Sequence, residues 1–196
     1  MRARRVVIAM SLLIVVLGTG VAQTNGPWIG THYQPGNVAF SLSAAAGGGI
    51  GSGFEVSLYP GAEYIFTKIR PGNAFSLDFG AGVKGAFALG DYAGTGTGGY
   101  MLVGAAPVFS AHFGLRGFSG SEFADYLDRL DLWTALGLGY QLLIPTGAST
   151  TGGAGLAIAN FSGINYFLTD NIAVTVSSNY FYGFSSTVAG GNFSGG

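Results

Sequence analysis

The stretch NAFSLDFGAGVKGAFAL, residues 73–89, alternates between apolar side chains and side chains that are small or polar. Two of the intervening positions hold charged residues, Asp78 and Lys84. Successive side chains of a β-strand point to opposite faces, so the alternation predicts a strand with one apolar face and one small, polar face. The apolar positions are Phe75, Leu77, Phe79, Ala81, Val83, Phe87 and Leu89.

The same period of two recurs along most of the chain and predicts six further strands. In the segment at residues 156–168 the alternation changes phase near Asn160, which we interpret as a β-bulge. Pro60 and Pro107 fall inside two other strands, and each is expected to mark a bulge or a strand start because proline cannot donate to a ladder. The six segments are residues 38–46, 54–68, 101–115, 132–142, 156–168 and 172–184.

The composition favours strands that cross a membrane. Only 9% of residues are charged, against about 25% in a typical soluble domain, and the mean hydropathy is +0.44. Past the N-terminus no apolar run reaches the roughly 20 residues of a membrane helix. Lipid requires the apolar face, a narrow lumen accepts small or polar groups, and closure pairs every backbone group. We therefore predict an all-β fold, an antiparallel up-and-down transmembrane β-barrel of about eight strands, seven of them clear.

The connections between these strands differ in length in an alternating way. RPGN at residues 70–73 and TDN at 169–171 are tight turns, whereas three longer, glycine-rich connections lie at 47–53, 90–99 and 145–155. Short turns on the periplasmic side and longer loops outside are typical of bacterial barrels. The exception is SGSEFADYLDRLD, residues 119–131, whose apolar residues repeat at helical spacing and predict a short helix that closes the barrel floor.

The N-terminus predicts a signal peptide over residues 1–22. Three arginines precede an apolar block at residues 6–17, and small residues surround a plausible cleavage point after Ala22. The alternative is an uncleaved anchor helix. Residues 23–196 would form the barrel domain, with no cysteine for a disulfide or a lipid anchor. Cleavage removes three of the eight basic residues and leaves a net charge near −4, which argues against a nucleic-acid partner.

An eighth strand is needed to close the barrel, and the segment WIGTHYQ, residues 28–34, is the candidate. It precedes QPGN, which resembles the turn RPGN, and AFSL follows each of them closely. We predict that it pairs with residues 172–184, because an open seam would leave unpaired N–H and C=O groups in lipid. A barrel truncated at its C-terminal strand is the alternative.

The segment GINYFLTDNIAVTVSSNYFYGF, residues 163–184, has an aromatic strand end, a tight turn and a second alternating strand with aromatic residues at its far end. In this it resembles the small outer-membrane β-barrel proteins of diderm bacteria, the OmpA-like and OmpX-like group. The resemblance implies a location in the bacterial outer membrane, with membrane lipid and the barrel insertion machinery as partners. Aromatic residues expected in the interfacial girdles are Trp133, Tyr166, Phe167, Tyr180, Tyr182 and Phe184.

The charged residues of the second face are the candidate site. Asp78 and Lys84 would face the lumen, and Glu63, His112 and Arg116 share their parity on neighbouring strands. Buried charges must pair, so we predict a structural salt-bridge network that plugs the lumen. A selectivity filter is the alternative.

The sequence therefore predicts a barrel with a structural or surface-interaction role, whose glycine-rich loops could contact an external ligand. The alternatives are a narrow, porin-like transport pore and, third, an envelope lipid hydrolase using Ser110 or His112. Residues two apart on a strand lie about 7 Å apart, usually too far for a nucleophile and its base. No ligand cluster or phosphate-binding loop is recognisable, so we expect no metal, no cofactor and no enzymatic activity.

Overall fold

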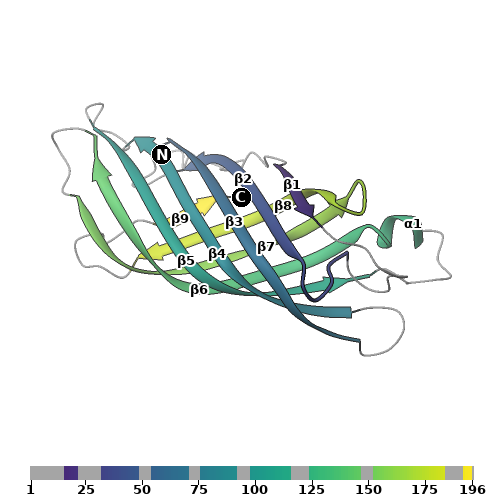
Figure 1. The fold of residues 1–196 in the computed structure, drawn as a ribbon. Helices are drawn as coiled ribbons and strands as arrows, with labels where there is room; N and C mark the ends of the chain where they lie inside the picture. Colours follow the sequence, from purple (N-terminus) through teal and green to yellow (C-terminus); the bar gives the residue numbers. More distant parts are fainter. Residues whose placement is uncertain are drawn as a thin grey trace, which may run out of the picture.

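In the computed structural model the chain is an antiparallel β-barrel, which confirms the predicted all-β, up-and-down architecture (Figure 1). The structure describes residues 16–21, 32–48, 54–70, 76–91, 98–115, 124–146, 152–183 and 192–195. The seven clear strands of the prediction are confirmed, and each is paired with its neighbour in the sequence. They are β2 (Val38–Gly48), β3 (Phe54–Ile69), β4 (Ser76–Asp91), β5 (Gly99–Gly114), β6 (Leu130–Pro145), β7 (Gly153–Phe167) and β8 (Ile172–Gly183).

The two ends of the barrel carry different connections. At one end, here called the turn end, β3 joins β4 through 70–75, β5 joins β6 through 115–129, and β7 joins β8 through 168–171. At the other, the loop end, the connections are 49–53, 92–98, 146–152 and 184–191. The turn-end connection between β5 and β6 contains a single helical turn, α1 (Ala124–Leu127), so the predicted short helix that closes the barrel floor is not confirmed.

The seam between β2 and β8 is filled by two short strands that run antiparallel to β8. β1 (Val16–Val21), which lies within the predicted signal peptide of residues 1–22, places its first four residues against Ile172 to Thr175 of β8 and its last two against Val38 and Ala39 of β2. β9 (Asn192–Gly195) pairs with residues 179–182 of β8 and also contacts β2. The barrel in Figure 1 is therefore nearly closed, and its seam consists of β1 and β9 lying between the edges of β2 and β8.

The predicted pairing of residues 28–34 with β8 is wrong for the part that the structure describes. His32, Tyr33 and Gln34 are not in a strand, and residues 28–31 lie outside the described residues. The edge of β8 is taken by β1 and β9 instead. Pro35 and the positive φ of Gly36, 96°, turn the chain directly before β2, with Asn37 N–H donating to Gln34 O.

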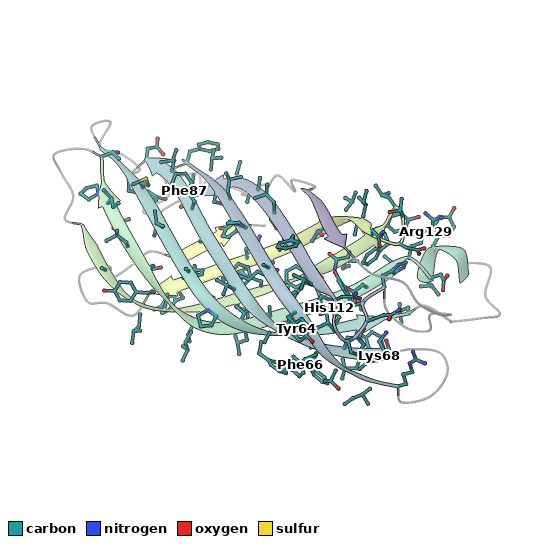
Figure 2. The ribbon with its side chains drawn as sticks, in the orientation of Figure 1. Tyr64, Phe66, Lys68, Phe87, His112 and Arg129 are labelled. Carbon is teal, nitrogen blue, oxygen red and sulfur yellow. The ribbon has the colours of Figure 1, made fainter. Side chains whose placement is uncertain are left out.

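The alternation divides the described strand residues into an outer apolar face and an inner face. Phe40, Val83, Phe109, Leu136 and Leu156 exemplify the outer face, and each is 51–65% exposed. Figure 2 shows two more of them, Tyr64 and Phe66, directed away from the barrel. Within the described strands the only exposed charged residue is Asp91, at the loop end of β4. The outer wall is thus apolar between its two rims.

The predicted bulges are absent from the positions expected. Pro60 and Pro107 each lack a pairing on one side, toward β4 and β6 respectively, but the register is the same before and after them. A residue offers its N–H to one neighbour only, so each proline interrupts one ladder and leaves the other intact. The single register shift among the described pairings lies between Ile65 and Thr67 of β3.

The predicted change of phase near Asn160 is also wrong. β7 keeps one register with β6 and with β8 along its whole length. Its inner face carries the bulky residues Phe161 and Phe167, both buried, so a rule that admits only small inner residues misreads this strand. No helix in the described part of the chain is long and apolar enough to span a membrane.

Candidate functional site

A cluster of charged side chains fills the interior near the turn end. His112 of β5 has Nδ1 2.8 Å from Asp131 Oδ2 of β6 and Nε2 3.3 Å from Glu63 Oε1 of β3. All three side chains are at most 6% exposed. Asn165 of β7 donates to the same Asp131 Oδ2, at 2.9 Å. Both imidazole nitrogens therefore face carboxylate oxygens, an arrangement that suits the imidazolium, the form in which both nitrogens donate.

A second ion pair joins Lys68 Nζ to Asp78 Oδ1 at 3.6 Å, beside His112, with which Asp78 is paired in the register of β4 and β5. Strict alternation along β3 would put Thr67 on the inner face and Lys68 on the outer one. The register shift after Ile65 reverses that parity, so Lys68 pairs opposite Asp78 and its side chain is 7% exposed. Sequence reasoning missed Lys68 because a bulge in a run of apolar residues leaves no sequence signal.

Residues 32–37 enter the same end of the barrel. The ring of Tyr33 lies 4.4 Å from that of His112, its hydroxyl accepts a hydrogen bond from Asn165, and its carbonyl accepts one from Lys68 Nζ at 2.7 Å. Burial, and then the nearby carboxylates of Asp131 and Glu63, hold the pKa of the Tyr33 phenol well above its usual range. The segment therefore covers the charge cluster from the turn end.

His32 anchors this segment at the rim. Its ring stacks on Phe167 with centroids 3.9 Å apart and planes at 10°, and Nε2 lies 3.0 Å from the carbonyl oxygen of Asp128. Asp170 Oδ1 is 3.9 Å from Nδ1. The loops that flank β6 and β8 thereby hold the plug formed by residues 32–37 in place.

Lys84 of β4 stands apart from these ion pairs. Its ammonium donates to Ser41 Oγ at 2.9 Å and lies 4.9 Å from the centroid of the Trp133 ring. No carboxylate oxygen among the described residues lies within 4.0 Å of it, although the side chain is only 4% exposed. Lys84 lines an internal cavity of about 40 Å³, together with Glu63, His112 and Trp133.

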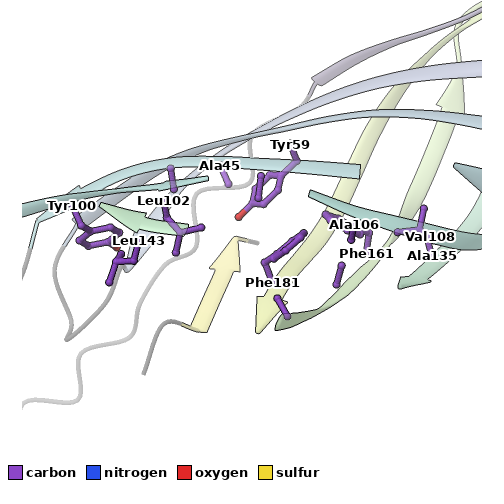
Figure 3. Close-up of a cluster of buried hydrophobic side chains, with 14 of the residues drawn as sticks. Ala45, Tyr59, Tyr100, Leu102, Ala106, Val108, Ala135, Leu143, Phe161 and Phe181 are labelled. Atoms are coloured by element: carbon purple, nitrogen blue, oxygen red, sulfur yellow. The ribbon is translucent and has the colours of Figure 1, made fainter. Parts of the chain in front are cut away.

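The loop-end half of the interior is filled mainly by apolar side chains (Figure 3), with Glu55, Ser57 and Gln141 as buried polar residues. Tyr59 and Phe181 each meet Phe161 edge-on, with ring centroids 6.1 and 6.2 Å apart. Tyr100 donates its hydroxyl hydrogen to Glu55 Oε2 at 2.6 Å, which gives the one buried acid of this half a partner. The smaller residues of the cluster include Ala45, Leu102, Ala106, Val108, Ala135 and Leu143.

Of the predicted lumen network, Glu63, Asp78, Lys84 and His112 lie on the inner face, and Arg116 lies outside the described residues. Glu63, Asp78 and His112 come together, whereas Lys84 contacts a hydroxyl and an indole instead. Asp131 and Asn165 are additional members. Asp131 was assigned to the helical connection because it sits at the edge of that polar segment, and Asn165 carries no charge.

Two predicted girdle residues face the interior instead. Trp133 is 8% exposed and lies under the Lys84 ammonium, and Phe167 is 4% exposed and stacks on His32. Tyr180 and Tyr182 are exposed on the outer face, and Tyr166 is half-buried. Phe184 lies outside the described residues. The narrow barrel accepts bulky aromatic rings inside wherever small residues on the opposite wall leave room.

The chemistry available to this site is ion pairing and hydrogen bonding. Ser110 is buried on the inner face of β5, but both nitrogens of His112 contact Asp131 and Glu63. Among the residues that the structure describes, no group of three or more potential ligands is arranged to hold a metal ion. No family model, no curated protein and no solved structure matches this chain.

Proposed function

We propose that this protein is an integral outer-membrane β-barrel of a diderm bacterium, with a structural or surface-interaction role and no enzymatic activity. The observation that carries the proposal is the separation of side chains across the wall. Large apolar residues face out on every strand from β2 to β8, and the strand charges face in, apart from Asp91 at the rim. In water such an exterior would drive aggregation, whereas in lipid it is the stable arrangement.

The strand lengths support the same proposal. β3, β4, β5 and β6 have 16 residues each and β7 has 15. At about 3.3 Å per residue such strands are roughly 50 Å long, and a tilt near 45° reduces this to roughly 35 Å along the barrel axis. That height exceeds the apolar band of about 25 Å that an outer-membrane barrel presents to lipid.

A non-conducting interior is the second part of the proposal. Residues 32–37, the charge cluster and the aromatic cluster follow one another along the axis, and each contains buried side chains, among them His32, His112 and Phe181. A plugged lumen supports a role carried by the loops of the loop end or by the outer surface of the barrel. It argues against a transport pore. The glycine-rich connections of the loop end are the candidate contacts for an external ligand.

Cell fractionation tests the location. The protein should remain in the membrane pellet after washing with carbonate or urea, and should migrate differently on a detergent gel before and after heating. Recovery as a soluble periplasmic protein would contradict the proposal.

Planar-bilayer recording tests the plug. The purified protein should give no stable conductance steps, because the buried clusters occupy the lumen. Reproducible single-channel steps would favour the narrow pore instead. A lipid-product assay on the same preparation should show no turnover; activity lost in His112→Ala would favour the hydrolase.

A further inference from the structure

Lys84 reaches from the middle of the wall to the seam. Its side chain crosses the inner face of β3 at Gly61, where a Cβ atom would overlap Lys84 Cδ and lie 2.7 Å from Ser41 Oγ. The ammonium thus ends beside Ser41 of β2, which is one of the two strands that border the seam. Glycine at position 61 is what allows a lysine from β4 to lie next to a strand two places away.

The cavity around the ammonium is bordered by both seam strands. Its lining includes Ala39 and Ser41 of β2, Ala173 and Thr175 of β8, and Phe40 and Leu42, whose side chains belong to the outer face. Among the described residues, β1 pairs with β8 as far as Thr175, and the pairing of β9 with β8 begins at Asn179. Residues 176–178 of β8 lie between these two paired stretches.

The cavity is lined by more hydrogen-bond donors than the neighbouring side chains accept. A lysine ammonium has three N–H donors, and the hydrogen bond to Ser41 Oγ uses one of them. The indole N–H of Trp133 is buried and has no hydrogen-bond partner. Glu63 also lines the cavity; its Oε1 faces the His112 ring, and its Oε2 is buried without a hydrogen-bond partner among the described residues, so it supplies one unused acceptor. The unused donors of Lys84 and Trp133 in the cavity lining therefore outnumber the single unused carboxylate oxygen of Glu63.

We propose that this cavity binds a carboxylate group, with Lys84 as its cationic partner and Trp133 as a second donor. The volume of about 40 Å³ corresponds to roughly three water molecules, which suits a carboxylate better than a bulkier phosphate ester. A second hollow, of about 400 Å³ and mainly apolar, is lined by Trp133 with Ile164 and residues 176–178. A hydrocarbon chain attached to the carboxylate would find an apolar surface there.

The carboxylate could come from a small acid in solution or from a fatty acid in the membrane. Only the second source depends on the proposed membrane location. The protein has two tryptophans, so Trp28→Phe leaves Trp133, beside the ammonium, as the sole tryptophan. Acetate, dodecanoate and dodecanol are titrated into this protein in a zwitterionic detergent, with Trp133 fluorescence as the readout.

Dodecanoate should change Trp133 emission saturably and bind at least about tenfold more tightly than dodecanol, because a charge-assisted hydrogen bond is lost with the alcohol. Saturation by acetate at comparable concentrations identifies a site for free carboxylates, and saturation by dodecanoate alone identifies a membrane amphiphile. Equal affinity for dodecanoate and dodecanol, or no saturable response to either carboxylate, would overturn the proposal.

Lys84→Met should weaken dodecanoate binding at least about tenfold. Arg129→Met is the matched control, since it removes one positive charge at the exposed rim and should leave binding unchanged. If Lys84→Met does not fold, Gly61→Ala displaces the lysine and keeps its charge, and should weaken binding similarly. Undiminished binding in whichever of these two variants folds would show that the ammonium is not the partner.

Discussion

The turn-end and loop-end halves of the barrel interior are filled by opposite kinds of side chain. Near the turn end, Glu63, Asp78 and Asp131 meet Lys68 and His112 at 2.8 to 3.6 Å. Near the loop end, aromatic and aliphatic side chains meet around Phe161, and Glu55 is the buried acid. Both halves belong to the same strands, so one β-sheet supports two different ways of excluding water from a narrow tube.

The difference lies in how strictly each half specifies its geometry. Apolar burial is non-directional, so the loop-end half tolerates substitutions that conserve volume. Ion pairs in a low-dielectric interior require every partner, because one uncompensated charge costs more than the pair contributes. The charge cluster therefore fixes which residues of β3, β4, β5 and β6 face each other, and the aromatic cluster fills the remaining space.

His112→Leu should produce the largest effect. The substitution leaves Glu63 and Asp131 buried beside an apolar side chain, and we expect it to lower the free energy of unfolding by about 3–5 kcal/mol. Urea titration in detergent, followed by the gel shift on heating, measures the loss. A decrease below about 1 kcal/mol would mean that the carboxylates find other partners and that the cluster is not strictly specified.

Lys68→Met and Lys84→Met compare two buried lysines of the same half. Loss of Lys68 strips Asp78, which is 0% exposed, of its ion pair and should cost about 3 kcal/mol. Loss of Lys84 removes a hydrogen bond to Ser41 and a contact with Trp133, and should cost about 1–2 kcal/mol. The sequence predicted an ion pair for Lys84, so a larger loss there than at Lys68 would revive that prediction.

Tyr100→Phe probes the one charged contact of the loop-end half. The variant keeps the ring but removes the hydroxyl that donates to Glu55, and we expect it to cost about 1–2 kcal/mol. The same urea titration measures the effect. Tyr59→Phe is a suitable control, because the Tyr59 hydroxyl has no hydrogen-bond partner among the described side chains and should be dispensable.

Phe161→Leu should have the smallest effect. It conserves most of the volume at the centre of the aromatic cluster, and the expected cost is about 1–1.5 kcal/mol. The loss should not depend on salt concentration, because no charge is involved. A cost as large as that of His112→Leu would show that the two halves are equally strict.

The fold was predictable from the sequence because apolar residues alternate with small or polar residues along the strands. Phe79, Val83 and Phe87 face outward as the opening stretch predicts, and Asp78 and Lys84 face inward. The aromatic filling of the interior was not predictable, because Phe161, Trp133 and Phe181 are of the same residue types as the side chains that face lipid. Whether such a ring faces lipid or the interior depends on the register with the neighbouring strands. It also depends on small residues across the lumen, which a local sequence pattern does not identify.

The charge cluster was predictable as a set of inner-face residues but not as a set of contacts. Glu63, Asp78 and His112 share a parity, yet Lys68 enters through a register shift and Tyr33 through a segment that precedes the first long strand. Lys84 was expected to form an ion pair. Its side chain instead passes over Gly61, where there is no Cβ atom, and reaches Ser41. Long-range placement of this kind depends on how the sheet closes, which no local pattern records.

The register shift between Ile65 and Thr67 also makes β3 sensitive to its own length. Inserting one further residue between Thr67 and Lys68 would reverse the parity again and turn Lys68 to the outer face, exchanging a buried ion pair for an ammonium in contact with lipid. A lysine on the lipid side costs about 2–4 kcal/mol at the bilayer midplane and less toward the interface, and Asp78 would lose its ion pair with Lys68 as well. Insertions that other strand ends tolerate should therefore be selected against between Thr67 and Lys68.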